Sequence, residues 1–298
     1  MKIGVSIYSL FQAIMSGELT PLGALEAISG YGADNIELVN FVTPIDTNEE
    51  LLKEIKDKCA NLGLAISAYS VGSDVLDKEG GEREAELARI FRQIDIAEKV
   101  GAPIIRSDLT KWGRPPEINM PEQFDKDLPI LVGICRKLAD YAAPKGITVT
   151  VENHGTYINN SERIRRLICA VDRPNYRVTL DVGNCLCVDE DPWVSLKNLL
   201  PYAATIHFKD FLVRKNGLAN GAGGPATFSV ASWLTTNYGN FLRGTIVGDG
   251  DIDTPRIVNE IVGSGYDGAL AIEFEGPEEC KLATQKSLAN LKRMAGRE

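Results

Sequence analysis

Eight short runs of β-branched and apolar residues alternate along the chain with segments that carry helical signals. Runs of this kind predict parallel strands joined by helical crossovers. Their number and order favour a (β/α)8 TIM barrel over an open doubly wound sheet. No linker or composition shift divides residues 1–298, which predicts a single domain. The expected strands are residues 3–8, 35–39, 64–71, 102–108, 147–152, 176–181, 203–207 and 269–274.

The intervening segments predict helices at 20–32, 47–62, 82–100, 121–145, 161–171, 192–199, 254–265 and 278–294. Thr47, followed by Glu50 three residues later, predicts a capping box at the second of these. Residues 211–253 form a long connection with the glycine-rich stretch NGLANGAGG at 216–224, and we expect a helix at 230–242. Connections of this length in a barrel usually serve as lids or binding loops. We therefore expect this segment to cover the site.

Four consecutive strands end in residues that commonly bind metals. The strand ends are Glu152 in VENHG, Asp181 in TLDVGN, His207 in IHFKD and Glu273 in AIEFEG. Each alone is ordinary, since a glutamate at a strand end is usually solvated and a lone histidine is usually structural. The carboxyl ends of barrel strands meet on one face, however, so we expect the four to converge. Three carboxylates and an imidazole suit Mn²⁺, Mg²⁺ or Co²⁺, with Zn²⁺ as a further candidate.

Composition argues against several classes of function. The formal net charge of -9 is unfavourable for binding a nucleic-acid backbone. No apolar run reaches the length of a membrane span, and the start MKIGVSIYSL lacks a signal-peptide pattern. The 6 cysteines are scattered, which is typical of reduced thiols in a cytoplasmic protein. A small sugar or polyol is the expected partner, and assembly into a homo-oligomer is left open.

In this order, the motifs VENHG, TLDVGN, IHFKD and AIEFEG resemble the sugar phosphate isomerase/epimerase family of xylose-isomerase-like TIM barrels. The resemblance extends over essentially the whole chain and is more specific for the superfamily than for the reaction. It implies a divalent metal, usually Mn²⁺, held by Glu152, Asp181, His207 and Glu273. It also implies that Glu152 and Glu273 face each other across the substrate.

These residue types suit proton transfer next to a carbonyl group. A metal that holds the carbonyl and the adjacent hydroxyl stabilises the enediolate as it forms. Glu152 and Glu273 are the expected proton-transfer pair. His154 is either a third acid/base group or a hydrogen-bond donor behind the metal ligands. Return of the proton gives epimerisation or isomerisation, whereas loss of a β-hydroxyl gives dehydration.

The surrounding residues bear on the substrate. The expected contacts are Asn184, Lys209, Trp112 and Arg106. Lys209 and its neighbour Asp210 either touch substrate or pair with each other, and Trp112 and Trp233 either stack on a sugar or pack beneath their loops. No phosphate-binding glycine loop with adjacent basic residues is evident, which favours an unphosphorylated keto-sugar or keto-polyol.

Departures from the ketose 3-epimerase pattern keep other reactions open. Those enzymes carry His, Glu and Arg where this chain has Asn184, Ile158 and Val213. The C-terminal part is similar to inosose dehydratases and to metal subunits of C-glycoside-cleaving enzymes. An isomerase or epimerase is the first interpretation, and a lyase or C-glycoside-cleaving subunit is the alternative. A non-catalytic sugar-binding barrel, a metal hydrolase and a zinc endonuclease are less favoured, since the endonucleases need many histidines and this chain has 2.

Overall fold

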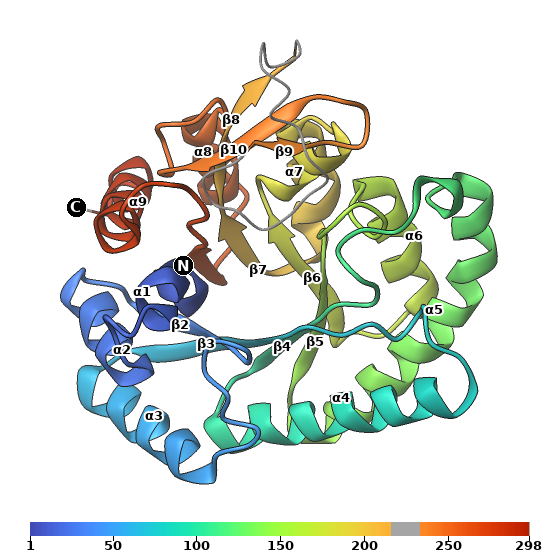
Figure 1. Cartoon of the computed structure of the whole chain (residues 1–298), viewed down its shortest axis with the longest axis horizontal. Helices are drawn as coiled ribbons and strands as arrows, with labels where there is room; N and C mark the ends of the chain where they lie inside the picture. Colours follow the sequence, from blue (N-terminus) through green and yellow to red (C-terminus); the bar gives the residue numbers. More distant parts are fainter. Residues whose placement is uncertain (216–232, 298) are drawn as a thin grey trace.

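A closed parallel barrel forms the centre of the molecule in the computed structural model, which describes residues 1–215 and 233–297 (Figure 1). Its strands follow the order β1-β11-β7-β6-β5-β4-β3-β2. They are β1 (Lys2–Ser6), β2 (Asn35–Val39), β3 (Ala65–Val71), β4 (Ile104–Ser107), β5 (Thr148–Glu152), β6 (Tyr176–Asp181), β7 (Ala203–Phe208) and β11 (Ala269–Ile272). The predicted TIM barrel is confirmed.

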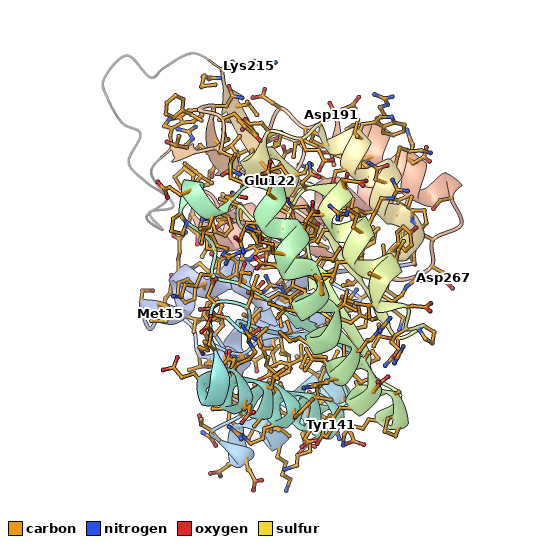
Figure 2. The ribbon with its side chains drawn as sticks, turned by 90° about the vertical axis from the view of Figure 1, so that its right-hand side faces the viewer. Met15, Glu122, Tyr141, Asp191, Lys215 and Asp267 are labelled. Atoms are coloured by element: carbon orange, nitrogen blue, oxygen red, sulfur yellow. The ribbon has the colours of Figure 1, made fainter. Side chains whose placement is uncertain are left out.

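Helices cover the outside of the barrel. They are α1 (Phe11–Met15), α2 (Pro21–Gly30), α3 (Glu49–Leu62), α4 (Gly80–Val100), α5 (Pro121–Ala142), α6 (Ser161–Val171), α7 (Pro192–Leu199), α8 (Thr254–Gly263) and α9 (Cys280–Met294). In Figure 2, Glu122 and Tyr141 mark the two ends of α5 on the outer wall, with α6 beside it. No helix in residues 1–215 or 233–297 has the length and apolar character to cross a bilayer.

The core lies between the strands and the inner faces of the helices. Ile94 of α4 and Leu138 of α5 are fully buried there. All five residues of β2 are buried, including the charged Glu37. Barrel strands are covered on both faces, so an apolar run such as NIELV is expected, and a carboxylate within it must find partners inside the protein.

The expected helix at 230–242 is wrong for the residues that the structure describes. Here β9 (Leu234–Thr235) and β10 (Phe241–Thr245) form an antiparallel pair, and β10 also pairs with β8 (Asp210–Arg214). A turn centred on Gly239, whose φ is +93°, reverses the chain between β9 and β10. Residues 230–232 and the stretch 216–224 lie outside the described residues. Pairing with β8 outweighs the helical signals, because strand formation depends on such tertiary partners.

The predicted capping box is also displaced. Helix α3 begins at Glu49, and the side chain of Asn48 accepts the Leu51 amide at 3.0 Å. Thr47 lies one residue too early and donates instead to the Pro44 carbonyl at 3.2 Å. Asn and Thr are both common N-cap residues, so pattern alone does not choose between adjacent positions.

Candidate active site

The structure brings together the four predicted metal-ligand side chains at the carboxyl ends of β5, β6, β7 and β11. One ligand atom from each of Glu152, Asp181, His207 and Glu273 lies within 4.8 Å of the other three. Two atoms that are each about 2.1 Å from one ion are at most about 4.2 Å apart, so a small contraction would bring these atoms to coordination distance. A carboxylate and histidine cluster of this kind could hold a divalent metal.

Asp181 is held with one carboxylate oxygen occupied and the other unpaired. Its Oδ1 accepts hydrogen bonds from the backbone N–H groups of Gly183 and Asn184, at 2.8 and 2.7 Å. Its Oδ2 is buried and makes no hydrogen bond within the described residues. Asn153 fixes the strand end, because its side chain donates to the Asp181 carbonyl and accepts the Asp181 amide. A buried carboxylate oxygen without a partner is costly, and a cation would satisfy it.

The electrostatics of the cluster also suit a cation. Burial raises the pKa of the Asp181 carboxyl, and the nearby Glu152 and Glu273 raise it further. Lys209 offsets part of this increase, and the pKa reaches about 6. Burial opposes protonation of His207, but Glu37, Glu152 and Glu273 outweigh it and raise the pKa of the imidazole well above its usual value. These clustered carboxylates favour added positive charge, which a divalent ion would supply.

Glu152 is almost fully enclosed by hydrogen-bond donors. The Arg106 guanidinium contacts Glu152 Oε2 at 2.6 Å, and the side-chain NH₂ of Asn184 donates to Glu152 Oε1 at 3.1 Å. Burial opposes ionisation of Glu152, but Arg106 and His207 outweigh it and hold its pKa far below the usual range. A carboxylate stabilised in this way is a good metal ligand and a weak base.

Glu273 lies in a more open place beside Lys209. The Lys209 ammonium contacts Glu273 Oε2 at 2.8 Å and Glu275 Oε2 at 3.1 Å. The Glu273 side chain is 14% exposed, compared with 2% for Glu152. Tyr8 donates its hydroxyl to Glu275 at 3.0 Å and completes this side of the site. Lys209 thus links the carboxylates of Glu273 and Glu275 on this side of the site.

His154 approaches from another side of the site. Its Nδ1 is 3.2 Å from Asp108 Oδ1, which also accepts from Arg106 at 2.7 Å. The Trp112 ring packs edge-on against the imidazole, with 4.7 Å between ring centres. Gly155 permits this packing: its φ is +66°, and a Cβ there would lie 2.2 Å from the Trp112 carbonyl oxygen.

A cavity of about 110 Å³ adjoins the cluster, because Glu152 and Glu273 form part of its lining. Its lining includes Arg106, Trp112, Glu152, His154, Lys209 and Glu273, together with Tyr8, Phe41, Ser70, Asp108 and Glu275. Three of the four expected substrate contacts therefore face this space. Asn184 does not: it is buried behind the wall, where it donates to Glu152 and accepts from Lys209 at 3.3 Å.

Two other candidates from the sequence lie elsewhere. The Asp210 carboxylate accepts the amides of Gly248 and Gly250 at 2.8 and 3.2 Å, so it anchors this turn. The Trp233 ring lies under the guanidinium groups of Arg214 and Arg243, 5.4 and 5.3 Å from the ring centre. Both residues have local structural roles in the part of the chain that the structure describes.

Asp108, Glu152 and His154 form a second group with metal-ligand atoms close together. Arg106 already bridges the two carboxylates of this group, at 2.7 Å to Asp108 and 2.6 Å to Glu152. A guanidinium in that position repels a second cation and satisfies the carboxylates itself. The group is therefore better suited to orienting His154 than to holding a metal.

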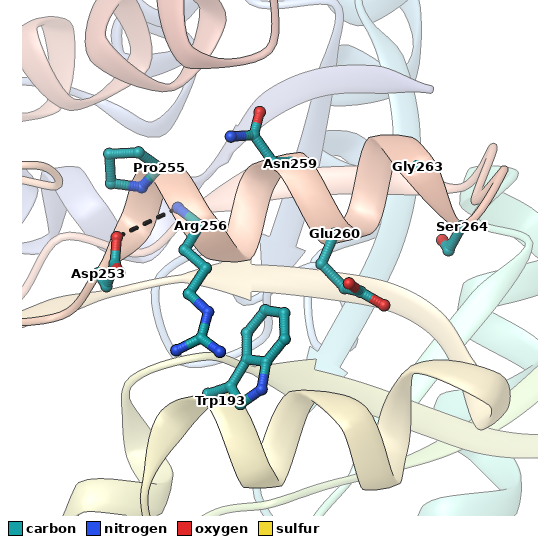
Figure 3. A pocket seen from close by; sticks show the side chains of 8 residues that line it. All are labelled: Trp193, Asp253, Pro255, Arg256, Asn259, Glu260, Gly263 and Ser264. Carbon is teal, nitrogen blue, oxygen red and sulfur yellow. Dashed lines mark hydrogen bonds between the residues drawn. The ribbon is translucent and has the colours of Figure 1, made fainter.

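A larger hollow of about 650 Å³ lies on the outer wall between α7 and α8 (Figure 3). The Arg256 guanidinium lies 3.8 Å from the centre of the Trp193 ring, and Asp253 caps α8 through the Arg256 amide. Glu260 in the lining is paired with Lys197. The hollow has none of the converging carboxylates found at the strand ends, so the smaller cavity is the candidate active site.

A family model described as xylose isomerase-like TIM barrel matches residues 25–294. The chain belongs to this family. Among curated relatives, an inosose dehydratase of Lactiplantibacillus plantarum is 28% identical over 148 residues, which are 48% of this chain and 46% of that protein. The match thus spans about half of that relative. A 3-oxo-isoapionate decarboxylase of Pectobacterium atrosepticum is 22% identical over 293 residues, 95% of this chain and 90% of that protein.

Several solved structures share the fold of this chain. A 3-keto-D-glucoside 4-epimerase of E. coli has a TM-score of 0.72 at 21% identity, over 98% of this chain and 99% of that chain. A Mycobacterium smegmatis protein in complex with magnesium scores 0.71 at 20% identity, over 99% and 97%. A protein with a bound zinc atom scores 0.73 at 15% identity, over 100% and 99%. Mg and Zn thus occur in structural neighbours of this barrel.

Proposed function

We propose that this protein is a divalent-metal-dependent isomerase or epimerase of an unphosphorylated keto-sugar or keto-polyol. The observation that carries the proposal is the convergence of Glu152, Asp181, His207 and Glu273 next to a cavity that further titratable side chains also line. The names of the relatives, which include epimerases and dehydratases, are consistent with chemistry at a carbon next to a carbonyl.

The metal ligands in this proposal are the same four residues, with Mn²⁺ as the expected native ion. A bound divalent ion would supply a Lewis acid that stabilises negative charge on the substrate oxygens. Arg106 fixes the orientation of Glu152 through Oε2, and the backbone amides at Gly183 and Asn184 fix Asp181 through Oδ1. Rigid ligands of this kind present a preformed site to substrate.

Two groups are placed for proton transfer from different sides of the cavity. Glu273 is paired with Lys209 on one side, and His154 is paired with Asp108 on the other. We assign proton removal and return to these two groups. Glu152 is assigned to metal binding, since its enclosure by Arg106 and Asn184 makes it a poor base.

Dehydration is the second candidate function. The observation that favours it is the partly exposed His154, 25% accessible and held by Asp108, because an imidazolium could protonate a departing β-hydroxyl. The alignment with an inosose dehydratase over about half its length is consistent with this reaction. The same proton-removal step would precede either outcome.

A screen of keto-sugars and inososes in deuterated water tests both candidates. After loading with Mn²⁺, proton NMR would follow exchange at the carbon next to the carbonyl, and mass spectrometry would follow loss of water. Exchange with an epimer or isomer as product supports the first function, and exchange with an unsaturated product supports the second. A substrate that reacts without carbon–hydrogen exchange would contradict both and point to hydrolysis.

A further inference from the structure

A buried carboxylate contacts His207 from the side opposite the other predicted ligands. Glu37 Oε2 lies against Nε2 of His207, whereas His207 Nδ1 faces Glu152 Oε1 at 3.3 Å and Glu273 Oε2 at 3.8 Å. Both side chains of the Glu37–His207 pair are 1% exposed. We infer that Glu37 is a positioning residue that fixes the imidazole of His207 for metal binding through Nδ1.

Glu37 reaches His207 across the barrel interior. It is on β2, whose neighbours in the barrel are β1 and β3, whereas His207 is on β7 between β11 and β6. The contact is therefore not a by-product of strand pairing. Ser70 of β3 donates its hydroxyl to the other oxygen, Oε1, of Glu37. With one oxygen held by Ser70, the second is directed at the imidazole.

This arrangement selects one form of the ring. A carboxylate against Nε2 favours a proton on that nitrogen, so in the neutral ring, the form that binds a metal, Nδ1 carries the lone pair. Nδ1 is buried and faces the predicted ligands Glu152 and Glu273, whereas Nε2 faces Glu37. A carboxylate that accepts the second ring N–H also makes the imidazole a stronger ligand, and loss of such a partner typically weakens metal binding about 10- to 100-fold.

The inference deepens the proposed function, because it rests on the metal site at Glu152, Asp181, His207 and Glu273. Its test compares Glu37→Ala and Glu37→Gln with the wild-type chain. Mn²⁺ affinity is measured by isothermal titration calorimetry, and the visible absorption of bound Co²⁺ reports the ligand field. Thermal unfolding of the metal-free proteins shows whether each variant is folded. None of these readouts requires a known substrate.

We expect Glu37→Ala to bind Mn²⁺ about 10- to 100-fold more weakly and to alter the Co²⁺ spectrum. Glu37→Gln should bind Mn²⁺ with an affinity between those of Glu37→Ala and the wild-type chain. A glutamine carbonyl can still accept a hydrogen bond from Nε2 but lacks the negative charge. Asp127→Asn is the matched control. Asp127 is also a buried carboxylate, but it pairs with Arg114 and Tyr157 away from the cluster, so wild-type affinity is expected.

Wild-type Mn²⁺ affinity and Co²⁺ spectrum in folded Glu37→Ala would overturn the role of Glu37 and leave the metal site standing. An equal loss in Asp127→Asn would also overturn it, because the effect would then be general. If Glu37→Ala does not fold, Glu37→Gln decides: weaker binding supports the inference, and unchanged binding overturns it. Failure of the wild-type chain to bind Mn²⁺, Co²⁺ or Zn²⁺ would instead refute the metal site itself, and the inference with it.

Discussion

The imidazole of His154 lies with its Nδ1 3.2 Å from Oδ1 of Asp108. An N–H on Nδ1 that donates to this carboxylate leaves Nε2 as the atom available to the cavity. Trp112, packed against the ring, restricts its rotation. The pair therefore resembles an oriented acid/base group more than a surface histidine that happens to lie near a carboxylate.

His154→Gln should lower turnover by about 10²-fold or more, the usual scale for loss of an acid/base group. Metal content should stay at the wild-type level, because His154 is outside the four-residue cluster. Asp108→Asn should lower turnover less, since the ring stays packed against Trp112. Steady-state kinetics and elemental analysis on the same samples check this. Full turnover in His154→Gln would show that the ring moves no proton.

The two glutamates of the cluster should respond differently to Glu→Gln changes. In Glu152→Gln, the new NH₂ group must face either the Arg106 guanidinium or the side-chain NH₂ of Asn184. Both of these groups are donors, so neither position suits the glutamine, and metal content should fall strongly. In Glu273→Gln, the carbonyl can still accept from Lys209, so more metal should remain while turnover falls about 10²-fold. Elemental analysis and deuterium exchange distinguish the two effects. Wild-type exchange in fully metallated Glu273→Gln would make His154 the leading base.

Stability at acidic pH should depend on Glu86. Burial opposes its ionisation, but Arg89, the Asp74 amide and Lys78 outweigh it and lower the pKa of Glu86 to about 2. An unfolded glutamate has a pKa of about 4.3. The contribution of ionised Glu86 to the free energy of unfolding is therefore fully present above pH ~4.3 and is lost as pH falls towards 2. Urea unfolding should show that Glu86→Gln is less stable than wild type at pH 6. The difference between their free energies of unfolding should be smaller at pH 3. A constant difference would contradict this prediction.

Gly155→Ala should destabilise the protein by about 1–3 kcal/mol, because it places a side chain at positive φ against the Trp112 carbonyl. Gly133→Ala is the control with the opposite sign. Gly133 lies in α5 with open space around it, and alanine in a helix is favoured over glycine by roughly 0.5–1 kcal/mol. Urea unfolding of both variants checks the pair. Equal stability of Gly155→Ala and wild type would show that the loop adapts at no cost.

The barrel and the convergence of the four strand-end residues could be predicted from the sequence, because strand periodicity and parallel topology bring strand ends to one face. Glu37 could not be assigned in this way. Its partner His207 is 170 positions away on a non-adjacent strand, and the only local signal was a carboxylate within the apolar run NIELV. Strands β9 and β10 were missed for a related reason, since their pairing with β8 is set by tertiary structure. The direction of the Asn184 side chain could not be predicted either, because it depends on contacts with Glu152 and Lys209 that come from other parts of the chain.

The Asp210 carboxylate joins the start of β8 to the turn at Gly248 and Gly250, and Asp251 adds a second link through the Val213 amide at 2.7 Å. The start of β8 is thus tied to this turn by side-chain contacts as well as to β10 by strand pairing. Asp210 follows Lys209 directly, so the same contacts that hold the turn also fix the backbone next to a lysine of the candidate site.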